Sequence, residues 1–86
     1  MTQHNLEGEP LPEHVWTKDP TRARAIREDP DMKAWHVVCA SLVGKAASRQ
    51  RAGNMAESRV YRHVAKVALN ARELAYYAWL RREGLA

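Results

Sequence analysis

The feature that most constrains this chain is a two-residue break, Gly53-Asn54, between two long segments with helical periodicity. Glycine readily adopts the left-handed conformation that ends a helix, and asparagine is a favoured N-cap for the helix that follows. Glu57 stands three residues after Asn54, which is the spacing of a capping box. Because so short a link leaves no room for a crossover, we expect helices over about 30–52 and 55–83 to form a long antiparallel hairpin.

Two Asp-Pro pairs predict where the earlier helices begin. Aspartate is a favoured N-cap, and proline at the first helical position loses no hydrogen bond there. Asp19-Pro20 therefore predicts a short helix over about 20–28. Asp29-Pro30 should end that helix and open the first long one, since a residue before proline avoids helical geometry.

The composition favours an all-α fold. Alanine, arginine, leucine and glutamate dominate, phenylalanine is absent, and no segment alternates cleanly between polar and apolar residues. A chain of 86 residues supports one small domain, which we expect over residues 18–86. Residues 1–17 read as an extended acidic leader, with Val15 and Trp16 anchoring its end to the helical body. Gly84 should terminate the last helix.

The single cysteine, Cys39, excludes a disulfide within the chain. Together with the lack of a secretory signal, it predicts a reducing, cytoplasmic location. The longest uncharged apolar stretch, 34–44, is far shorter than the roughly 20 residues that span a bilayer. We therefore expect no membrane role.

The second long helix carries a coiled-coil pattern. Six apolar residues repeat at alternating spacings of four and three, namely Val60, Val64, Val67, Ala71, Leu74 and Ala78. Further apolar residues flank this seam, so the apolar arc is wider than one partner helix can cover. We therefore predict a homodimer with a four-helix core, and keep a monomer as the alternative. The residues expected at this self-association contact are Val37, Gly44, Leu69, Tyr76 and Leu80.

Charge is distributed unevenly along the chain. Residues 1–31 carry a net charge of −3 and residues 32–72 a net charge of +7. Six basic residues gather at the closed end of the expected hairpin, namely Lys45, Arg49, Arg51, Arg59, Arg62 and Lys66. Such a cluster could neutralise phosphates, bind an acidic protein partner, receive the acidic leader of the same or a neighbouring chain, or remain a solvated face.

The sequence offers no clear catalytic or metal-binding arrangement. His36 and Cys39 are one helical turn apart, which suits two metal ligands, but a closed site needs two more. In the hairpin register His36 faces the region near Asn70 and Arg72, which supplies no further ligand. Glu57 is expected in the helix cap, and Glu73 in ordinary surface pairing beside Lys66 and Tyr77. We therefore predict no enzyme activity, no cofactor and no metal.

Aromatic residues gather at the open end of the hairpin, where we expect Trp35, Tyr76, Tyr77 and Trp79 to form core. If Trp79 or Tyr77 is exposed, this end becomes a partner-docking patch. The function we predict is a non-enzymatic helical interaction module that self-associates and binds a protein partner in a regulatory or accessory role. The alternative is a nucleic-acid-binding protein that uses the basic tip.

Overall fold

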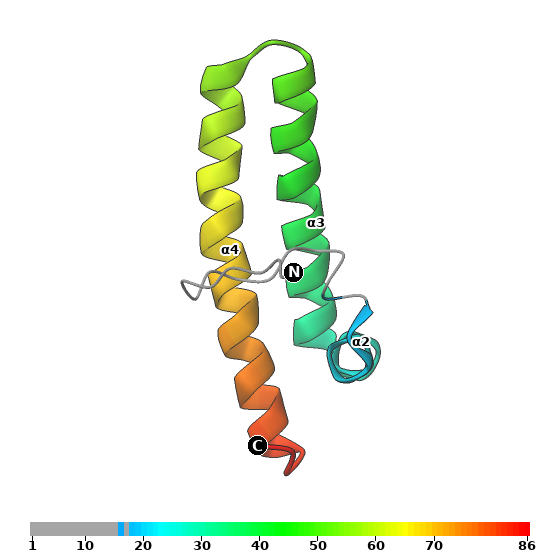
Figure 1. Cartoon of the computed structure of the whole chain (residues 1–86). Helices are drawn as coiled ribbons and strands as arrows, with labels where there is room; N and C mark the ends of the chain where they lie inside the picture. The colour runs from blue at the N-terminus through cyan, green and yellow to red at the C-terminus, as the bar shows by residue number, and fades with distance from the viewer. Residues whose placement is uncertain (1–15, 17) are drawn as a thin grey trace, which may run out of the picture.

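The structure is a computed structural model that describes residues 16 and 18–86 (Figure 1). Its helices are α2 (Pro20–Glu28), α3 (Pro30–Arg51) and α4 (Met55–Arg82). No strand occurs among the described residues, so the predicted all-α class is confirmed. The bounds of all three helices agree with the sequence prediction to within about one residue. Apart from Trp16, the predicted leader over 1–17 lies outside the described residues.

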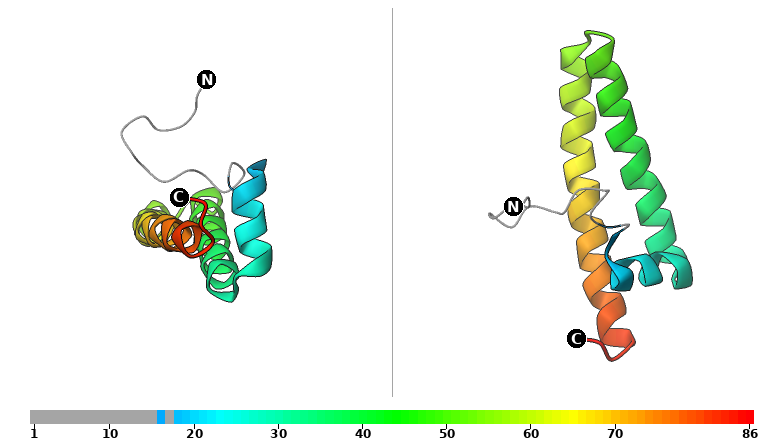
Figure 2. Two further views of the ribbon diagram at one scale, coloured as in Figure 1. Left: turned by 90° about the horizontal axis from the view of Figure 1, so that it is seen from below. Right: turned by 45° about the vertical axis from the view of Figure 1, so that its right-hand side comes forward.

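The two long helices run antiparallel, and α2 lies across the open end of the pair (Figures 1 and 2). In Figure 1, α2 is seen almost end-on beside the first turns of α3, and Figure 2 shows it from two further sides. The chain therefore forms a helical hairpin with the short helix α2 across its open end and the α3–α4 turn at its closed end.

Both Asp-Pro pairs cap helices as expected. The Asp19 carboxylate accepts hydrogen bonds from the backbone N–H groups of Thr21 and Arg22 at 2.9 and 3.1 Å. Asp29 accepts one from the N–H of Met32 at 3.1 Å. These bonds satisfy donors that have no partner inside the helix.

The turn between α3 and α4 is a Schellman arrangement. Gly53 has a φ of +82°, and its N–H donates to the Gln50 carbonyl at 3.0 Å, while the Asn54 N–H donates to the Arg49 carbonyl at 2.9 Å. Asn54 caps α4 by accepting from the Glu57 N–H at 3.1 Å. The second hydrogen bond of the predicted capping box, from the Asn54 N–H to the Glu57 carboxylate, is wrong. The Asn54 N–H donates to the Arg49 carbonyl instead, and the Glu57 carboxylate accepts from Arg49 Nε at 2.8 Å.

Small side chains line most of the contact between α3 and α4. The buried residues there are Cys39, Ala46, Ser58, Ala65 and Ala68. The Ser58 hydroxyl donates to the Ala46 carbonyl at 2.9 Å, so even the polar member of the set joins the two helices. Such small groups allow close helix approach but bury little apolar area each.

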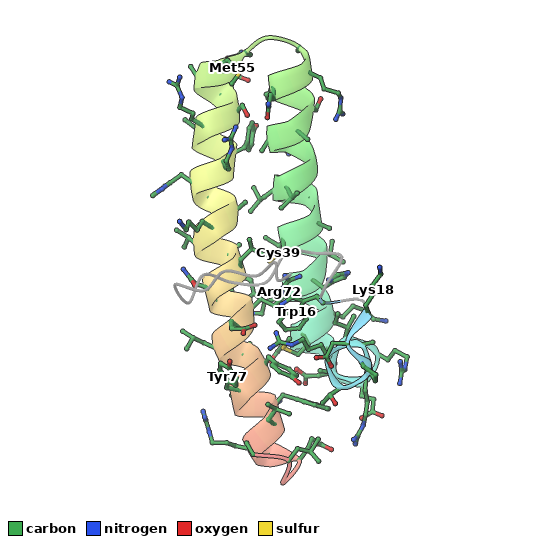
Figure 3. All side chains as sticks on the ribbon, viewed as in Figure 1. Trp16, Lys18, Cys39, Met55, Arg72 and Tyr77 are labelled. Carbon is green, nitrogen blue, oxygen red and sulfur yellow. The ribbon has the colours of Figure 1, made fainter. Side chains whose placement is uncertain are left out.

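The bulky core residues gather at the open end, where α2 covers the hairpin. They are Trp16, Met32, Tyr76 and Trp79, with Ala25 of α2 against them. Figure 3 shows Trp16 beside Arg72 at this level of the hairpin. Trp16 therefore anchors the start of the described chain to the helical body, as predicted.

Gly53 in the turn and Gly44 in the middle of α3 provide a matched test of how glycine affects stability. Gly53→Ala should lower the free energy of unfolding by about 1 kcal/mol, because a side chain disfavours the left-handed conformation. Gly44→Ala should raise it by about 0.5–1 kcal/mol, because a methyl there meets no atom within 4 Å and alanine is the better helix former. Urea unfolding of both variants measures the difference, and equal effects would contradict the turn geometry.

Candidate interaction surfaces

The coiled-coil seam of α4 faces away from α3. Packing against α3 uses the neighbouring arc, which carries Ala65, Ala68 and Arg72. The side chains of Val60, Val67 and Leu74 are 62%, 58% and 70% exposed. The seam on α4 is defined as Val60, Val64, Val67, Ala71, Leu74 and Ala78. Within the described part of the chain, its valines and Leu74 are exposed, and its two alanines are half-buried.

The basic tip contains the six predicted side chains Lys45, Arg49, Arg51, Arg59, Arg62 and Lys66, and the structure brings them to the closed end of the hairpin. Some have partners within the tip. Arg49 pairs with Glu57 at 2.8 Å, and its guanidinium lies 5.5 Å from the centre of the Tyr61 ring. Arg62 donates to the Ser58 hydroxyl at 3.2 Å. Five of the six side chains are exposed and Arg49 is half-buried, so the tip presents positive charge to solvent.

A groove of about 430 Å³ runs between α3 and α4 below the tip. It is lined by Val43, Ala46, Ala47, Gln50, Arg62, Ala65, Lys66 and Leu69. Alanines at its floor leave space that larger side chains would fill. Its walls are mainly apolar, and two cations of the basic tip stand at its edge.

The predicted self-association residues do not come together. Val37 and Gly44 lie on exposed surface of α3. Leu69 lines the groove, and Leu80 packs against the core cluster. Tyr76 is only 5% exposed and belongs to the chain's own core, because Trp16 packs against its ring with the centroids 5.2 Å apart.

The open end combines aromatic rings with two arginines. The Arg72 guanidinium is buried 4.2 Å from the centre of the Trp16 ring, and the Arg22 guanidinium lies 4.6 Å from the same ring. Arg72 also contacts Nδ1 of His36 at 3.2 Å, the neighbour that the hairpin register predicts. Cation–π contact compensates in part for removing a charge from water. Burial of Arg72 could not be predicted from the sequence, because a lone basic residue on a helix usually faces solvent.

Ion pairs hold α2 against α4. Arg22 forms a forked pair with Glu73, with distances of 2.6 and 3.3 Å. Burial alone would lower the pKa of Arg22, but the hydrogen bond and charge of Glu73 outweigh it and raise the pKa above its usual value. Glu73 also accepts from the Tyr77 hydroxyl at 3.3 Å. The expected surface pairing of Glu73 with neighbours on α4 is thus only one of its contacts, because Glu73 also pairs with Arg22 of α2.

Trp79 is buried, Trp35 is half-buried, and Tyr77, labelled in Figure 3, is exposed. Tyr76 and Trp79 therefore belong to the core, as predicted, whereas the prediction that Tyr77 is core is wrong. The alternative stated for an exposed Tyr77, a partner-docking patch at this end, stays a prediction. Cys39 is also buried. Over residues 16 and 18–86, no group of three or more His, Cys, Asp or Glu side chains is placed to hold a metal ion. Within the same range, no helix has the length and apolarity to cross a bilayer.

A comparison with protein-family models finds no match, and comparisons with curated proteins and with solved structures find no significant similarity.

Burial of Tyr76 gives the fold a specific pH dependence. Loss of water around the phenol disfavours its ionised form and raises the pKa of Tyr76 above its ordinary value of 10.0, although the Arg22 charge opposes this. The folded state then holds this proton more tightly than the unfolded state, so the free energy of unfolding should fall as the pH rises above about 10. Tyr76→Phe should make this fall shallower in urea unfolding between about pH 9 and 11.

Tyr77→Phe is the matched control, because the Tyr77 ring is exposed on the same helix. Its unfolding curves should keep the wild-type decline with pH. An identical decline in the Tyr76→Phe variant would show that the phenol of Tyr76 does not contribute to it.

Proposed function

We propose that this chain is a non-enzymatic helical interaction module. It self-associates through the α4 seam and presents its remaining surfaces to a protein partner in a regulatory or accessory role. The observation that carries the proposal is the exposure of a seam whose spacing is that of a coiled coil. A reducing, cytoplasmic setting is part of the proposal, and the lone buried thiol of Cys39 is compatible with it.

A second copy of the chain is the occupant that suits the seam. The six residues are all apolar and extend over 18 helical steps, or about 27 Å. Alanine at positions 71 and 78 permits close approach of another helix, and valine or leucine supplies the apolar contact at the intervening positions. With a twofold axis near Val67 and Ala71, the N-terminal half of the seam in one chain would pack against the C-terminal half of the seam in the second copy.

Electrostatics favour an antiparallel arrangement of the two copies of α4. The segment from residue 45 to residue 66 carries six basic side chains and only Glu57, a net charge of +5. Parallel pairing would bring the two tips together within about one Debye length, roughly 8 Å at physiological salt. Antiparallel pairing separates them by most of the length of α4, and the α3 helices then complete a four-helix core.

A charge in the seam tests self-association. Val67→Glu should weaken the dimer by about 100-fold or more, because pairing would bury two carboxylates without partners. Sedimentation equilibrium over a range of protein concentrations measures the dissociation constant. Val38→Glu is the matched control and should leave it unchanged, because Val38 is also exposed but is turned about 100° or more from Val37 and Gly44 around α3.

A wild-type chain that remains monomeric at high micromolar concentration would refute the proposal. Equal weakening by Val67→Glu and Val38→Glu would locate the contact elsewhere than the seam. Circular dichroism of both variants distinguishes loss of pairing from loss of fold.

Nucleic-acid binding is the second candidate, and the exposure of Arg51 and Arg59 at the tip is the observation that favours it. Binding to random duplex DNA should then weaken steeply between low and physiological salt, because contacts to phosphates release counterions. The double variant Arg51→Ala/Arg59→Ala should weaken binding further and reduce the salt dependence by about two phosphate contacts. Fluorescence anisotropy with a labelled duplex measures both, and no binding at low salt would remove this candidate.

A further inference from the structure

The groove between α3 and α4 continues the face of the hairpin that α2 covers at the open end. Leu69 and Tyr76 are seven residues apart on α4, so they share one face of the helix. Tyr76 is covered by α2, because the Arg22 guanidinium lies 4.5 Å from the centre of its ring. Leu69 lines the groove, to which α2 contributes no lining residue. Within the described residues, one half of this face is therefore covered by a helix and the other half is open.

The groove has the length and the walls of a site for a short helix. Val43 and Gln50 are seven residues apart on α3, and Arg62 and Leu69 are seven residues apart on α4, so each wall extends about 10.5 Å, or two helical turns. An extended peptide would leave backbone N–H and C=O groups without partners against these apolar walls, whereas a helix satisfies most of them internally. An amphipathic helix therefore suits the groove better than an extended segment.

The charge around the groove favours an acidic occupant. None of the described residues that line the groove is an acid. Arg62 donates to the Ser58 hydroxyl at 3.2 Å, and this neutral acceptor does not compensate the charge of the guanidinium. Glu57, the one acid between residues 45 and 66, pairs with Arg49 and does not line the groove. A carboxylate on an occupant would thus meet a positive potential at this site.

We propose that the groove binds a short amphipathic helix of a partner protein, with acidic residues beside its apolar stripe. The apolar side chains of this helix pack between Ala47 and Leu69, and a carboxylate near its end at the tip pairs with Arg62. The inference rests on the proposed function, because it assigns the expected contact with a protein partner to one surface. Duplex nucleic acid does not suit this site, because it has no apolar stripe to cover the alanine floor.

The groove opens away from the seam. Val67 and Leu69 are two residues apart, which turns their side chains about 200° from each other around α4. Leu69 lines the groove, whereas Val67 is exposed on the outer side. A partner helix in the groove and a second copy on the seam would thus not compete for the same surface.

Binding of two synthetic peptides to the full-length chain tests the proposal. Both are helical peptides of about 14 residues with leucines at alternating spacings of three and four. One peptide carries glutamates beside the leucines, and the other carries lysines at the same positions. Fluorescence anisotropy at physiological salt should show that the acidic peptide binds about tenfold or more tightly than the basic one. Equal affinities, or no saturation by the acidic peptide up to about 1 mM, would overturn the proposal.

Charge reversal in the chain locates the contact. Arg62→Glu should weaken binding of the acidic peptide about tenfold and strengthen binding of the basic peptide. Arg59→Glu is the matched control, since it changes the net charge equally at an exposed position of the tip that does not line the groove. The same loss of affinity in both variants would indicate general attraction to the tip and would contradict binding in the groove.

Filling the groove tests its apolar part. Ala47→Leu should weaken binding of the acidic peptide several-fold, because the added side chain occupies the floor of the groove. Ser41→Leu adds the same side chain at an exposed position turned about 120° from Ala47, and should leave the affinity unchanged. Circular dichroism establishes that each variant is folded. An unchanged affinity in Ala47→Leu would place the peptide outside the groove.

Val67→Glu separates this test from the test of self-association, because it should leave the affinity for the acidic peptide unchanged. A wild-type chain that dimerises but does not bind the acidic peptide would overturn this inference alone. A monomeric chain that binds it in the groove would support this inference and refute only self-association. Loss of the dimer in both Arg62→Glu and Ala47→Leu, measured by sedimentation equilibrium, would assign the groove to a second copy and so overturn the inference.

Discussion

The small side chains between α3 and α4 are the constraint on which the rest of the structure depends. Cys39 and Ala46 of α3 meet Ser58, Ala65 and Ala68 of α4. Burial contributes about 25 cal/mol per Å² of apolar surface, so this contact stabilises the hairpin less than one built from leucine or valine would. The larger valines lie instead on the outer side of α4. A hairpin built in this way has a thin core and an exposed apolar face.

The open end of the hairpin contains the large buried side chains that the rest of the contact between α3 and α4 lacks. Trp16, Tyr76 and Trp79 bury large apolar rings there, and Arg22 and Arg72 lie against those rings. The ion pair of Arg22 with Glu73 fixes α2 against α4. Since Trp16 precedes α2, the same cluster also determines where the N-terminal part of the chain meets the hairpin.

The three surfaces occupy different parts of the hairpin, and charge connects them. The seam and the groove lie on different sides of α4, and the basic tip closes the hairpin above the groove. Positive charge at the tip disfavours pairing of two tips and therefore favours the antiparallel dimer that we propose.

Local chemistry was sufficient to determine the helices from the sequence. Asp19, Asp29 and Asn54 cap their own helices, and Gly53 ends α3 through bonds that span only a few residues. A two-residue turn then sets the register, which is why the proximity of His36 to Arg72 was predictable. The clustering of the basic residues at the tip followed from the same register.

Only the tertiary structure decided which side of α4 faces α3. The apolar arc of α4 is so wide that several rotations about the helix axis would bury similar apolar area, and no local rule chooses between them. The choice depends on contacts distant in sequence, namely Trp16 against Tyr76 and Arg22 with Glu73. Those contacts place Arg72 and Tyr76 inside and Val67 outside. The sequence by itself therefore determined the helices and their turn, and long-range packing determined which residues remain available for binding.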